Sequence, residues 1–267
     1  MKRDYLSYSA LKAFAKSPNH YLQYVNKEHA ETPAMVLGSL THCLVLEPEQ
    51  FAAKFAVAPK VDRRTNSGKA LWSAFEHESE GRAVVTEEMY HNAAAIADAV
   101  SRNSLAYRIL IGKQAEHAIE GEIDGMPFKG IADAIDARTV VDLKTCQDAS
   151  PEGFRRAASN FDYHLQAAIY LQLTGCQEYY WVAVESAAPY NVSVYRPTPL
   201  SIGAASAYLS QLIERFKAWD GKPKGYGENI YDLDLPPWHP ANQAWENPSA
   251  PVLDNNDNEF NSFINSL

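Results

Sequence analysis

Hydrophobic residues in the first hundred positions recur at the three- and four-residue spacing of amphipathic helices. This spacing predicts a helix that Ser7 or Ser9 caps and Pro18 ends, and a second helix that begins near Tyr21. The apolar stretch PAMVLGSLTHCLVL predicts a buried helix of about 12 residues that stops before Pro48. A further helix is predicted for TEEMYHNAAAIADAVSRN, because its first turn is acidic, as the helix dipole prefers.

Residues 58–70 interrupt this helical pattern with a polar, turn-rich sequence. We expect a mobile loop there. The loop carries four cationic side chains: Lys60, Arg63, Arg64 and Lys69.

After about residue 114 the pattern changes to the alternation of strands. The pair Asp124-Gly125 predicts one hairpin turn, and the segment DART at 136–139 lies between two further strand segments. A helix ending at Gly175, two strands and a long helix follow. Helices followed by a mainly antiparallel meander predict a mixed α/β (α+β) domain with a helical N-terminal part.

This order also predicts the domain organisation. We expect one domain over residues 1–221, made of a helical part (1–110) and a core (111–221). Prolines, glycines and asparagines dominate residues 222–267, which predicts an irregular C-terminal tail.

Composition narrows the class of protein. With 46% hydrophobic residues in 267, the chain can bury a sizeable core. A net charge of −9 argues against indiscriminate binding of polyanions, but leaves room for a local basic groove. The three scattered cysteines form no disulfide framework, and we find no signal peptide or membrane-spanning run. We therefore expect a cytoplasmic protein with no membrane partner.

The segment VVDLK carries the strongest chemical signal. Asp142 and Lys144 share one face of the predicted strand, and a hairpin through DART would bring Asp133 beside Asp142. Two converging carboxylates suit Mg²⁺, and a nearby lysine can orient water or stabilise charge on a phosphate. The alternative interpretation is a surface hairpin with a salt bridge.

Two other segments add polar groups. Gln166 and Tyr170 are four residues apart, so they share a helix face, where they would hold a phosphate or a base near a metal. Taken alone, such a pair is more often two ordinary semi-buried polar residues. His42 lies in the apolar helix before Pro48, either as a hydrogen-bonded core residue or as a nitrogen ligand to a divalent ion.

Taken together, these segments resemble the PD-(D/E)xK nuclease superfamily. The likeness is closest to its RecB-like branch and, within that branch, to RecE-type exodeoxyribonuclease VIII. LSYSALKAFAKSPNHYLQY resembles the branch's serine-rich start and its CPxxY/F helix, with Ser17 where cysteine often stands. LGSLTHCLVLEPEQF resembles the histidine helix, GIADAID…VVDLKT the GxxD…DxKT core, and YHLQAAIY the QxxxY motif. The likeness covers roughly residues 5–215, with four separated motifs in the family's order.

The resemblance implies a restriction-endonuclease-like core, with a mixed central sheet flanked by helices. It implies that the metal is bound by His42, Asp133, Asp142 and the backbone carbonyl of Leu143. In such a site Lys144 positions the attacking water, while Gln166 and Tyr170 support the site and contact DNA. An upstream glutamate often joins such a site. Glu116 and Glu120 are both candidates, and we favour Glu116.

The activity implied is a Mg²⁺-dependent exodeoxyribonuclease, with Mn²⁺ as a substitute, acting on linear double-stranded DNA. Digestion would run 5′ to 3′ and leave 3′ overhangs for a single-strand annealing protein, in recombination of phage or prophage type. The resemblance also implies a ring-shaped homo-oligomer, a trimer or a tetramer, around DNA ends. Three scattered cysteines cannot supply a four-cysteine site alone, so we expect no iron–sulfur cluster.

Phosphate contacts are expected from basic side chains. The candidates are Arg63, Arg64, Lys69, Lys129, Arg155 and Arg156. Two other functions stay open. One is a RecB-like nuclease that acts on single-stranded DNA or as an endonuclease in a defence system. The other is an inactive DNA-binding protein of the same fold.

Overall fold

The computed structural model of the chain describes residues 5–27, 31–227, 230 and 232–235. Contacts divide the chain into two units, residues 1–225 and residues 226–267. The first unit holds every helix and strand of the described residues. Most of the predicted C-terminal tail lies outside the described residues.

A five-stranded sheet forms the centre of the first unit. Its strands, in spatial order, are β3 (Gln114–Ile123), β4 (Met126–Ile135), β5 (Thr139–Cys146), β6 (Glu178–Glu185) and β7 (Val192–Tyr195). All neighbouring pairs are antiparallel except β5 and β6. Asp124 and Gly125 both have left-handed φ angles, 48° and 70°, as a two-residue hairpin turn requires. The predicted hairpin is therefore confirmed.

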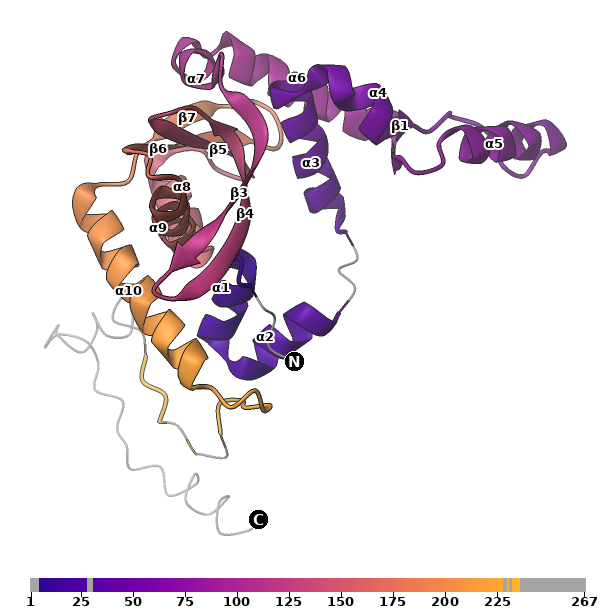
Figure 1. The fold of residues 1–267 in the computed structure, drawn as a ribbon. Helices are drawn as coiled ribbons and strands as arrows, with labels where there is room; N and C mark the ends of the chain where they lie inside the picture. Colours follow the sequence, from indigo (N-terminus) through magenta and orange to yellow (C-terminus); the bar gives the residue numbers. More distant parts are fainter. Residues whose placement is uncertain (1–4, 28–30, 228–229, 231, 236–267) are drawn as a thin grey trace, which may run out of the picture. The chain divides into compact units, whose positions relative to one another are not determined.

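Helices cover both faces of this sheet (Figure 1). One face packs against α1 (Tyr8–Lys16), α2 (Pro18–Asn26), α8 (Pro151–Asn160), α9 (Tyr163–Thr174) and α10 (Pro199–Ala218). The other packs against α3 (Pro33–Leu46), α6 (Glu87–Arg102) and α7 (Ser104–Leu110). Every residue of α9 from Leu165 to Tyr170 is buried, so this helix is central to the core. The predicted fold class, a mixed α/β core flanked by helices, is confirmed.

The second helix begins earlier than the sequence predicts. Ser17 ends α1, and its side chain accepts a hydrogen bond from the backbone N–H of His20, which caps α2. Pro18 then occupies the first position of α2, where its missing N–H costs nothing. Pro18 therefore both stops one helix and starts the next.

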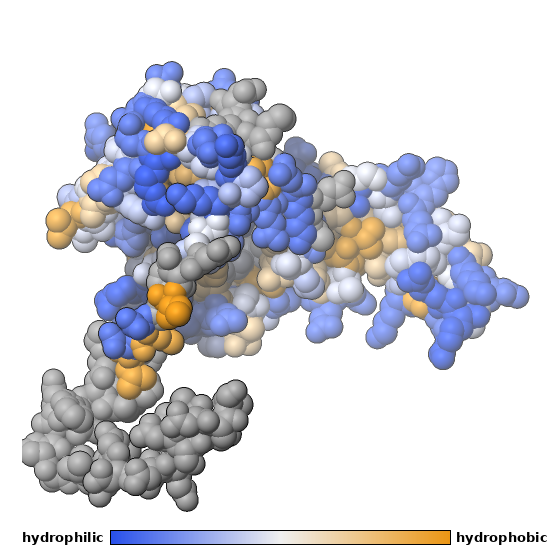
Figure 2. Space-filling model, turned by 90° about the horizontal axis from the view of Figure 1, so that it is seen from below, coloured by the Kyte–Doolittle hydropathy of each residue, from blue (hydrophilic) through white to orange (hydrophobic). Residues whose placement is uncertain are grey.

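A small excursion separates α3 from α6. After η1 (Pro48–Gln50) and α4 (Phe51–Lys54), the strands β1 (Phe55–Val57) and β2 (Ala83–Val85) pair in parallel. Between these strands, α5 (Asn66–Glu78) lies apart from the central sheet (Figure 1). Gly68 is the only buried residue of α5, and the surface of this helix is mostly hydrophilic (Figure 2).

The expected loop over 58–70 is correct for residues 58–65 and wrong for residues 66–70, which open α5. Thr65 caps this helix, because its hydroxyl accepts a 3.0 Å hydrogen bond from the N–H of Gly68. Gly68 is required there, since a Cβ atom would lie 2.0 Å from the Asp62 carbonyl oxygen.

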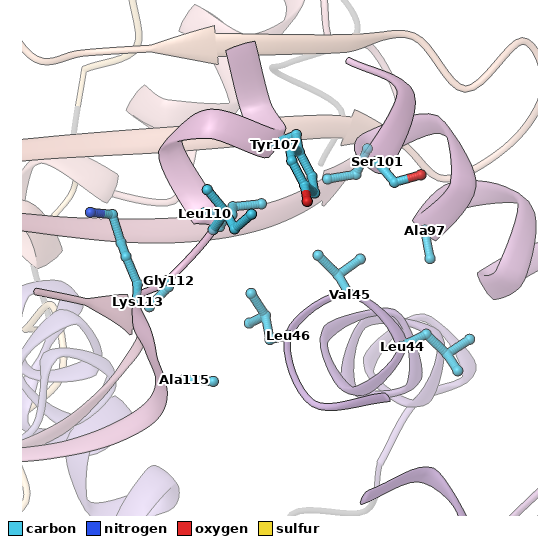
Figure 3. A pocket seen from close by; sticks show the side chains of 13 residues that line it. Leu44, Val45, Leu46, Ala97, Ser101, Tyr107, Leu110, Gly112, Lys113 and Ala115 are labelled. Carbon is cyan, nitrogen blue, oxygen red and sulfur yellow. The ribbon is translucent and has the colours of Figure 1, made fainter. Parts of the chain in front are cut away.

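An apolar cavity of about 280 Å³ lies beside the sheet, between the end of α3, α6, α7 and the start of β3 (Figure 3). Lys113 is the one charged residue of its lining, and its ammonium pairs with Asp136. Apart from this paired lysine, the lining therefore carries no charge. Among the described residues, no helix is both long and apolar enough to cross a membrane.

Candidate active site

The β4–β5 hairpin brings Asp133 beside the DLK segment. Ala134 pairs with Val141 in the sheet, and the Oδ2 atom of Asp133 accepts a 2.7 Å hydrogen bond from the N–H of Leu143. Asp136 fixes the turn between the strands, because its Oδ1 atom accepts the N–H groups of Arg138 and Thr139 at 2.9 and 2.8 Å. The hairpin through DART thus places the two aspartates on adjacent strands, as the sequence predicts.

Three side chains with metal-binding atoms converge at one edge of this hairpin. His42 from α3, Glu116 from β3 and Asp133 from β4 hold their ligand atoms within 4.8 Å of one another. The Nδ1 atom of His42 lies 3.7 Å from Asp133 Oδ2 and 3.9 Å from Glu116 Oε1. We call these three residues the His42 cluster. It is the only such group among the residues that the structure describes.

The hydrogen bond at Nε2 of His42 determines which ring nitrogen carries the hydrogen in the neutral ring. Its Nε2 atom lies 2.8 Å from the Leu143 carbonyl oxygen, which can only accept, so Nε2 carries the hydrogen. In the neutral ring, Nδ1 then presents its lone pair toward the two carboxylates, as a metal ligand must. The Leu143 carbonyl, an expected ligand, thus contacts the side of the ring opposite to Nδ1, and its binding of a metal stays a prediction.

Electrostatics within the cluster favours a cation. Burial lowers the pKa of His42, but the carboxylates of Asp133 and Glu116 outweigh burial and leave this pKa raised. The proximity of His42 in turn lowers the pKa of Glu116, although burial opposes this shift. The Glu116 carboxylate therefore stays charged, which favours a cation at this position.

Glu116 reaches this position through an unusual backbone conformation. Its φ angle is 46°, in the left-handed region that costs a side-chain-bearing residue about 1–2 kcal/mol. Its neighbours Ala115 and His117 pair with Ala134 and Ala132, so Glu116 stands across from Asp133. Glu120, the other candidate, is exposed and is not part of the His42 cluster. The geometry thus favours Glu116.

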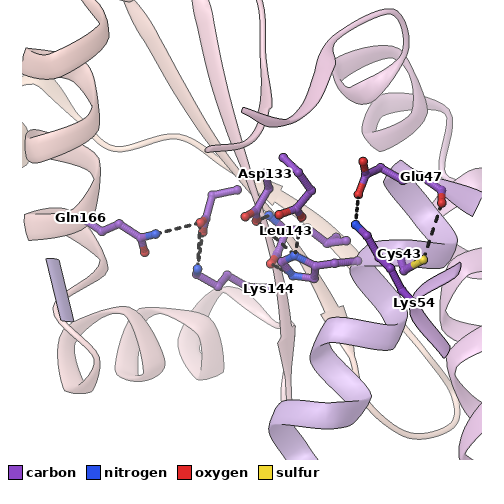
Figure 4. A network of polar contacts seen from close by, with 10 residues as sticks. Cys43, Glu47, Lys54, Asp133, Leu143, Lys144 and Gln166 are labelled. Atoms are coloured by element: carbon purple, nitrogen blue, oxygen red, sulfur yellow. Dashed lines mark hydrogen bonds and ion pairs between the residues drawn. The ribbon is translucent and has the colours of Figure 1, made fainter. Parts of the chain in front are cut away.

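Asp142 contacts two other side chains, Lys144 and Gln166, both labelled in Figure 4. The ammonium of Lys144 lies 2.8 and 2.7 Å from its two carboxylate oxygens, and Gln166 Nε2 donates to Oδ1 at 3.1 Å. Asp142 is 1% exposed, and burial raises its pKa to about 6, with Asp133 adding to the shift and Lys144 opposing it. Its carboxylate is thus engaged by Lys144 and Gln166, and does not belong to the His42 cluster.

A cavity of about 300 Å³ opens beside Lys144. Its lining includes the predicted residues Lys129, Gln166 and Tyr170. The Tyr170 ring packs against Gly130, which starts the GIAD segment. The lining also includes Lys12 and Tyr163, which the sequence analysis missed. Tyr163 precedes Gln166 by three residues and so shares its helix face. This spacing could have identified Tyr163 from the sequence.

The remaining predicted DNA contacts lie elsewhere. Arg63 stacks over the Trp72 ring at 4.1 Å, and Arg64 forms an ion pair with Asp62. These two arginines lie just before α5, and Lys69 lies in its first turn. Arg155 and Arg156 each form a 3.1 Å ion pair with Glu152 on α8. Only Lys129 of the six lines the cavity beside Lys144. The DNA contacts of all six stay predictions.

Comparison with known proteins agrees with this geometry. The model of a family described as a PDDEXK-like domain of unknown function (DUF3799) matches residues 7–224. A search of curated protein sequences found no match. Among solved structures, a proposed exonuclease from Eubacterium rectale is similar with a TM-score of 0.57 and 15% identity, over 80% of each chain.

Two other solved structures are more distant. An alkaline exonuclease from Laribacter hongkongensis aligns with a TM-score of 0.31 and 15% identity, over 64% of this chain and 93% of its own. A phage-related exonuclease from Haemophilus somnus 129PT aligns with a TM-score of 0.29 and 12% identity, over 66% and 95%.

The chain belongs to the PDDEXK-like family, whose model spans the whole α/β unit. Its class is therefore that of the PD-(D/E)xK nucleases, as the sequence motifs predict, and the expectation of a nuclease is confirmed at this level. The Eubacterium rectale structure, at its low identity, shows that the fold is shared.

Proposed function

We propose that the protein is a cytoplasmic Mg²⁺-dependent exodeoxyribonuclease that degrades linear double-stranded DNA from 5′ to 3′. The 3′ overhangs left behind would serve a single-strand annealing partner in recombination. The observation that carries this proposal is that Asp133 of the His42 cluster lies on β4, next to the Asp142–Lys144 pair on β5. The four segments that resemble RecE-type enzymes support the exonuclease assignment.

The donor atoms fit a divalent cation. Two carboxylates supply oxygen donors of the kind that Mg²⁺ and Mn²⁺ prefer, and the Nδ1 atom of His42 adds a nitrogen donor. We propose that His42 Nδ1 and the carboxylates of Glu116 and Asp133 hold the ion, with the Asp142 carboxylate on the neighbouring strand. When bound, the ion supplies Lewis-acid stabilisation of the phosphate and a more acidic water.

The chain's own groups act around that position. The Lys144 ammonium reaches the cavity from beside Asp142, where it can stabilise charge on the attacked phosphate or orient water. Burial lowers the pKa of Lys144, but Asp142 and Asp133 outweigh burial and raise it, so Lys144 acts as a cation and not as a base. Gln166 holds Asp142 in place through its amide, and Tyr170 lines the wall against Gly130.

The test uses linear duplex DNA labelled at the 5′ or the 3′ end, with Mg²⁺ and EDTA lanes and a closed circular duplex. Release of mononucleotides from the 5′ label, only with Mg²⁺ and with the circle intact, is the expected result. Cutting of the circle would indicate an endonuclease, and digestion restricted to a single-stranded oligonucleotide would indicate the single-strand alternative. No cleavage with any divalent metal would leave an inactive DNA-binding protein.

A ring-shaped homo-oligomer, trimer or tetramer, is part of the proposal. A ring would let an acidic protein hold DNA, because its basic residues would line the channel. Light scattering coupled to size-exclusion chromatography measures the mass directly. A monomer of 29.7 kDa at working concentrations would contradict a ring.

A further inference from the structure

Two cavities adjoin on the α1–α2 side of the molecule. The first is the one beside Lys144, with about 300 Å³. The second, of about 450 Å³, lies over α1 and α2 and is lined by Lys16, Gln23, Tyr24 and Lys27, among others. Ser9 and Lys12 line both cavities. The two cavities therefore lie side by side along α1, and we call them together the α1–α2 groove.

Four lysines of this groove lack, among the described residues, the ion-pair partner that several arginines elsewhere on the chain have. Arg64, Arg102, Arg138, Arg155 and Arg156 each have a carboxylate within ion-pair distance. Within the described part of the chain, no such carboxylate partner is found for Lys12, Lys16, Lys27 or Lys129. On a protein of net charge −9, unpaired lysines gathered along one groove make a local anion site.

Aromatic rings lie among these lysines. The Lys12 ammonium lies 5.2 Å from the Tyr8 ring centroid and 5.5 Å from that of Phe161, and Lys144 lies 5.0 Å from that of Tyr163. Phe161 is 51% exposed, which is a large apolar surface to leave in water. Unpaired bases stack on such rings, whereas paired bases inside a duplex are already stacked.

We propose that the α1–α2 groove binds a single DNA strand and leads it to Lys144, with phosphates on Lys12, Lys16, Lys27 and Lys129 and bases on Phe161. This inference rests on the proposed nuclease function and adds the path of the substrate strand. It also gives the duplex exonuclease a place for the strand being degraded, because that strand must leave its partner to reach a cavity of about 300 Å³.

The test measures binding of a fluorescein-labelled 20-nucleotide single strand by anisotropy, in EDTA so that no cleavage occurs. The double variant Lys16→Ala/Lys27→Ala should bind on the order of tenfold more weakly than wild type. Its slope of log affinity against log salt should be shallower by about 1.4, because each lost phosphate contact on a single strand removes about 0.7. Arg108→Ala, an exposed cation on α7, is the matched control and should match wild type.

A third variant separates stacking from charge. Phe161→Ala should weaken single-strand binding and leave the salt slope unchanged, since the ring contacts no phosphate. A blunt duplex of the same sequence should lose less affinity than the single strand in both variants. Equal losses on duplex and single strand would overturn the single-strand path, as would wild-type affinity and slope in the double variant.

The failure of the proposed function looks different. If wild-type protein binds no DNA in this assay and cleaves none with Mg²⁺, both proposals fall. If wild type cleaves DNA and the double variant binds and cleaves equally well, the nuclease assignment stands and the groove is excluded. Circular dichroism spectra confirm that each variant is folded, and Lys16, Lys27 and Phe161 are exposed enough for the fold to tolerate alanine.

Discussion

The ring of Tyr170 lies directly over the Cα atom of Gly130, so closely that a Cβ atom on Gly130 would stand 2.9 Å from a ring carbon. Gly130 opens the GIAD segment of β4, and Tyr170 ends the QAAIY segment of α9. Two motifs that are forty residues apart in sequence thus pack against each other, and the packing requires a residue without a side chain at position 130.

Gly130→Ala should lower the free energy of unfolding by about 1–3 kcal/mol, because the added methyl must displace a buried ring. Gly203→Ala on α10 is the matched control, since its Cβ would meet nothing within 4 Å. Because alanine favours a helix over glycine, Gly203→Ala should raise stability by about 0.5–1 kcal/mol. Urea unfolding measures both. Equal effects of the two substitutions would contradict the close packing.

Lys144→Ala should lower the cleavage rate by about 10²- to 10³-fold or more, because it removes a cation that stabilises charge on the phosphate, while the protein stays folded. Asp142 loses its cationic partner in this variant, and it can take up a proton instead of staying charged in the core, because burial already raises its pKa to about 6. Asp133→Ala and Asp142→Ala should abolish cleavage. Rates on end-labelled DNA measure the effect, with the exposed Lys222→Ala as control. Full activity in Lys144→Ala would show that the site is assigned wrongly.

Glu116→Gln should weaken binding of Mn²⁺ by at least about tenfold, and Glu120→Gln should leave it unchanged. The reason is that Glu116 holds its carboxylate beside His42 and Asp133, whereas Glu120 lies exposed on the same strand. Isothermal titration calorimetry without DNA measures the Mn²⁺ affinity. His42→Ala should also weaken Mn²⁺ binding, and it should slow cleavage. A larger effect at Glu120 would reverse the choice between the two glutamates.

Asp136 should make stability depend on pH in the acid range. The hydrogen bond from the Lys113 ammonium, together with the N–H groups of Arg138 and Thr139, lowers the pKa of this carboxyl to about 2. Since the unfolded value lies near 3.8, this stabilisation is present above about pH 4 and is lost as the pH falls toward 2. In urea unfolding, the stability difference between wild type and Asp136→Asn should therefore shrink from pH 5 to pH 3. A difference that is constant over this range would contradict the shift.

Much of the fold follows from local patterns. The Asp124-Gly125 turn, the alternation along β4 and β5, and the helix ending at Gly175 all predicted the elements that form. The three-residue strands β1 and β2 were not predicted, because so short a run carries no period. The start of α5 at Asn66 was missed, because a polar sequence hid the cap at Thr65.

The sequence predicted which residues gather at the candidate site better than it predicted their contacts with one another. Spacing placed Asp133 beside the DLK segment, since a hairpin register is a local property. Spacing did not reveal that Asp142 would bind Lys144 and Gln166 and not join His42, because this depends on how α9 packs. The left-handed conformation of Glu116 and the gathering of Lys12, Lys16 and Lys27 along one groove likewise depend on the tertiary structure.

The burial of α9 on all sides limits how this protein can change. Positions 165–170 hold Gln166 and Tyr170 between residues that fill the core, so random substitution there would mostly yield insoluble protein and not altered substrates. Selection for new substrate preferences, in nature or in a library, would instead find tolerant positions along the exposed faces of α1, α2 and α5. We therefore expect the sequence of α9 to change little among related proteins, and the exposed positions of α1, α2 and α5 to vary more.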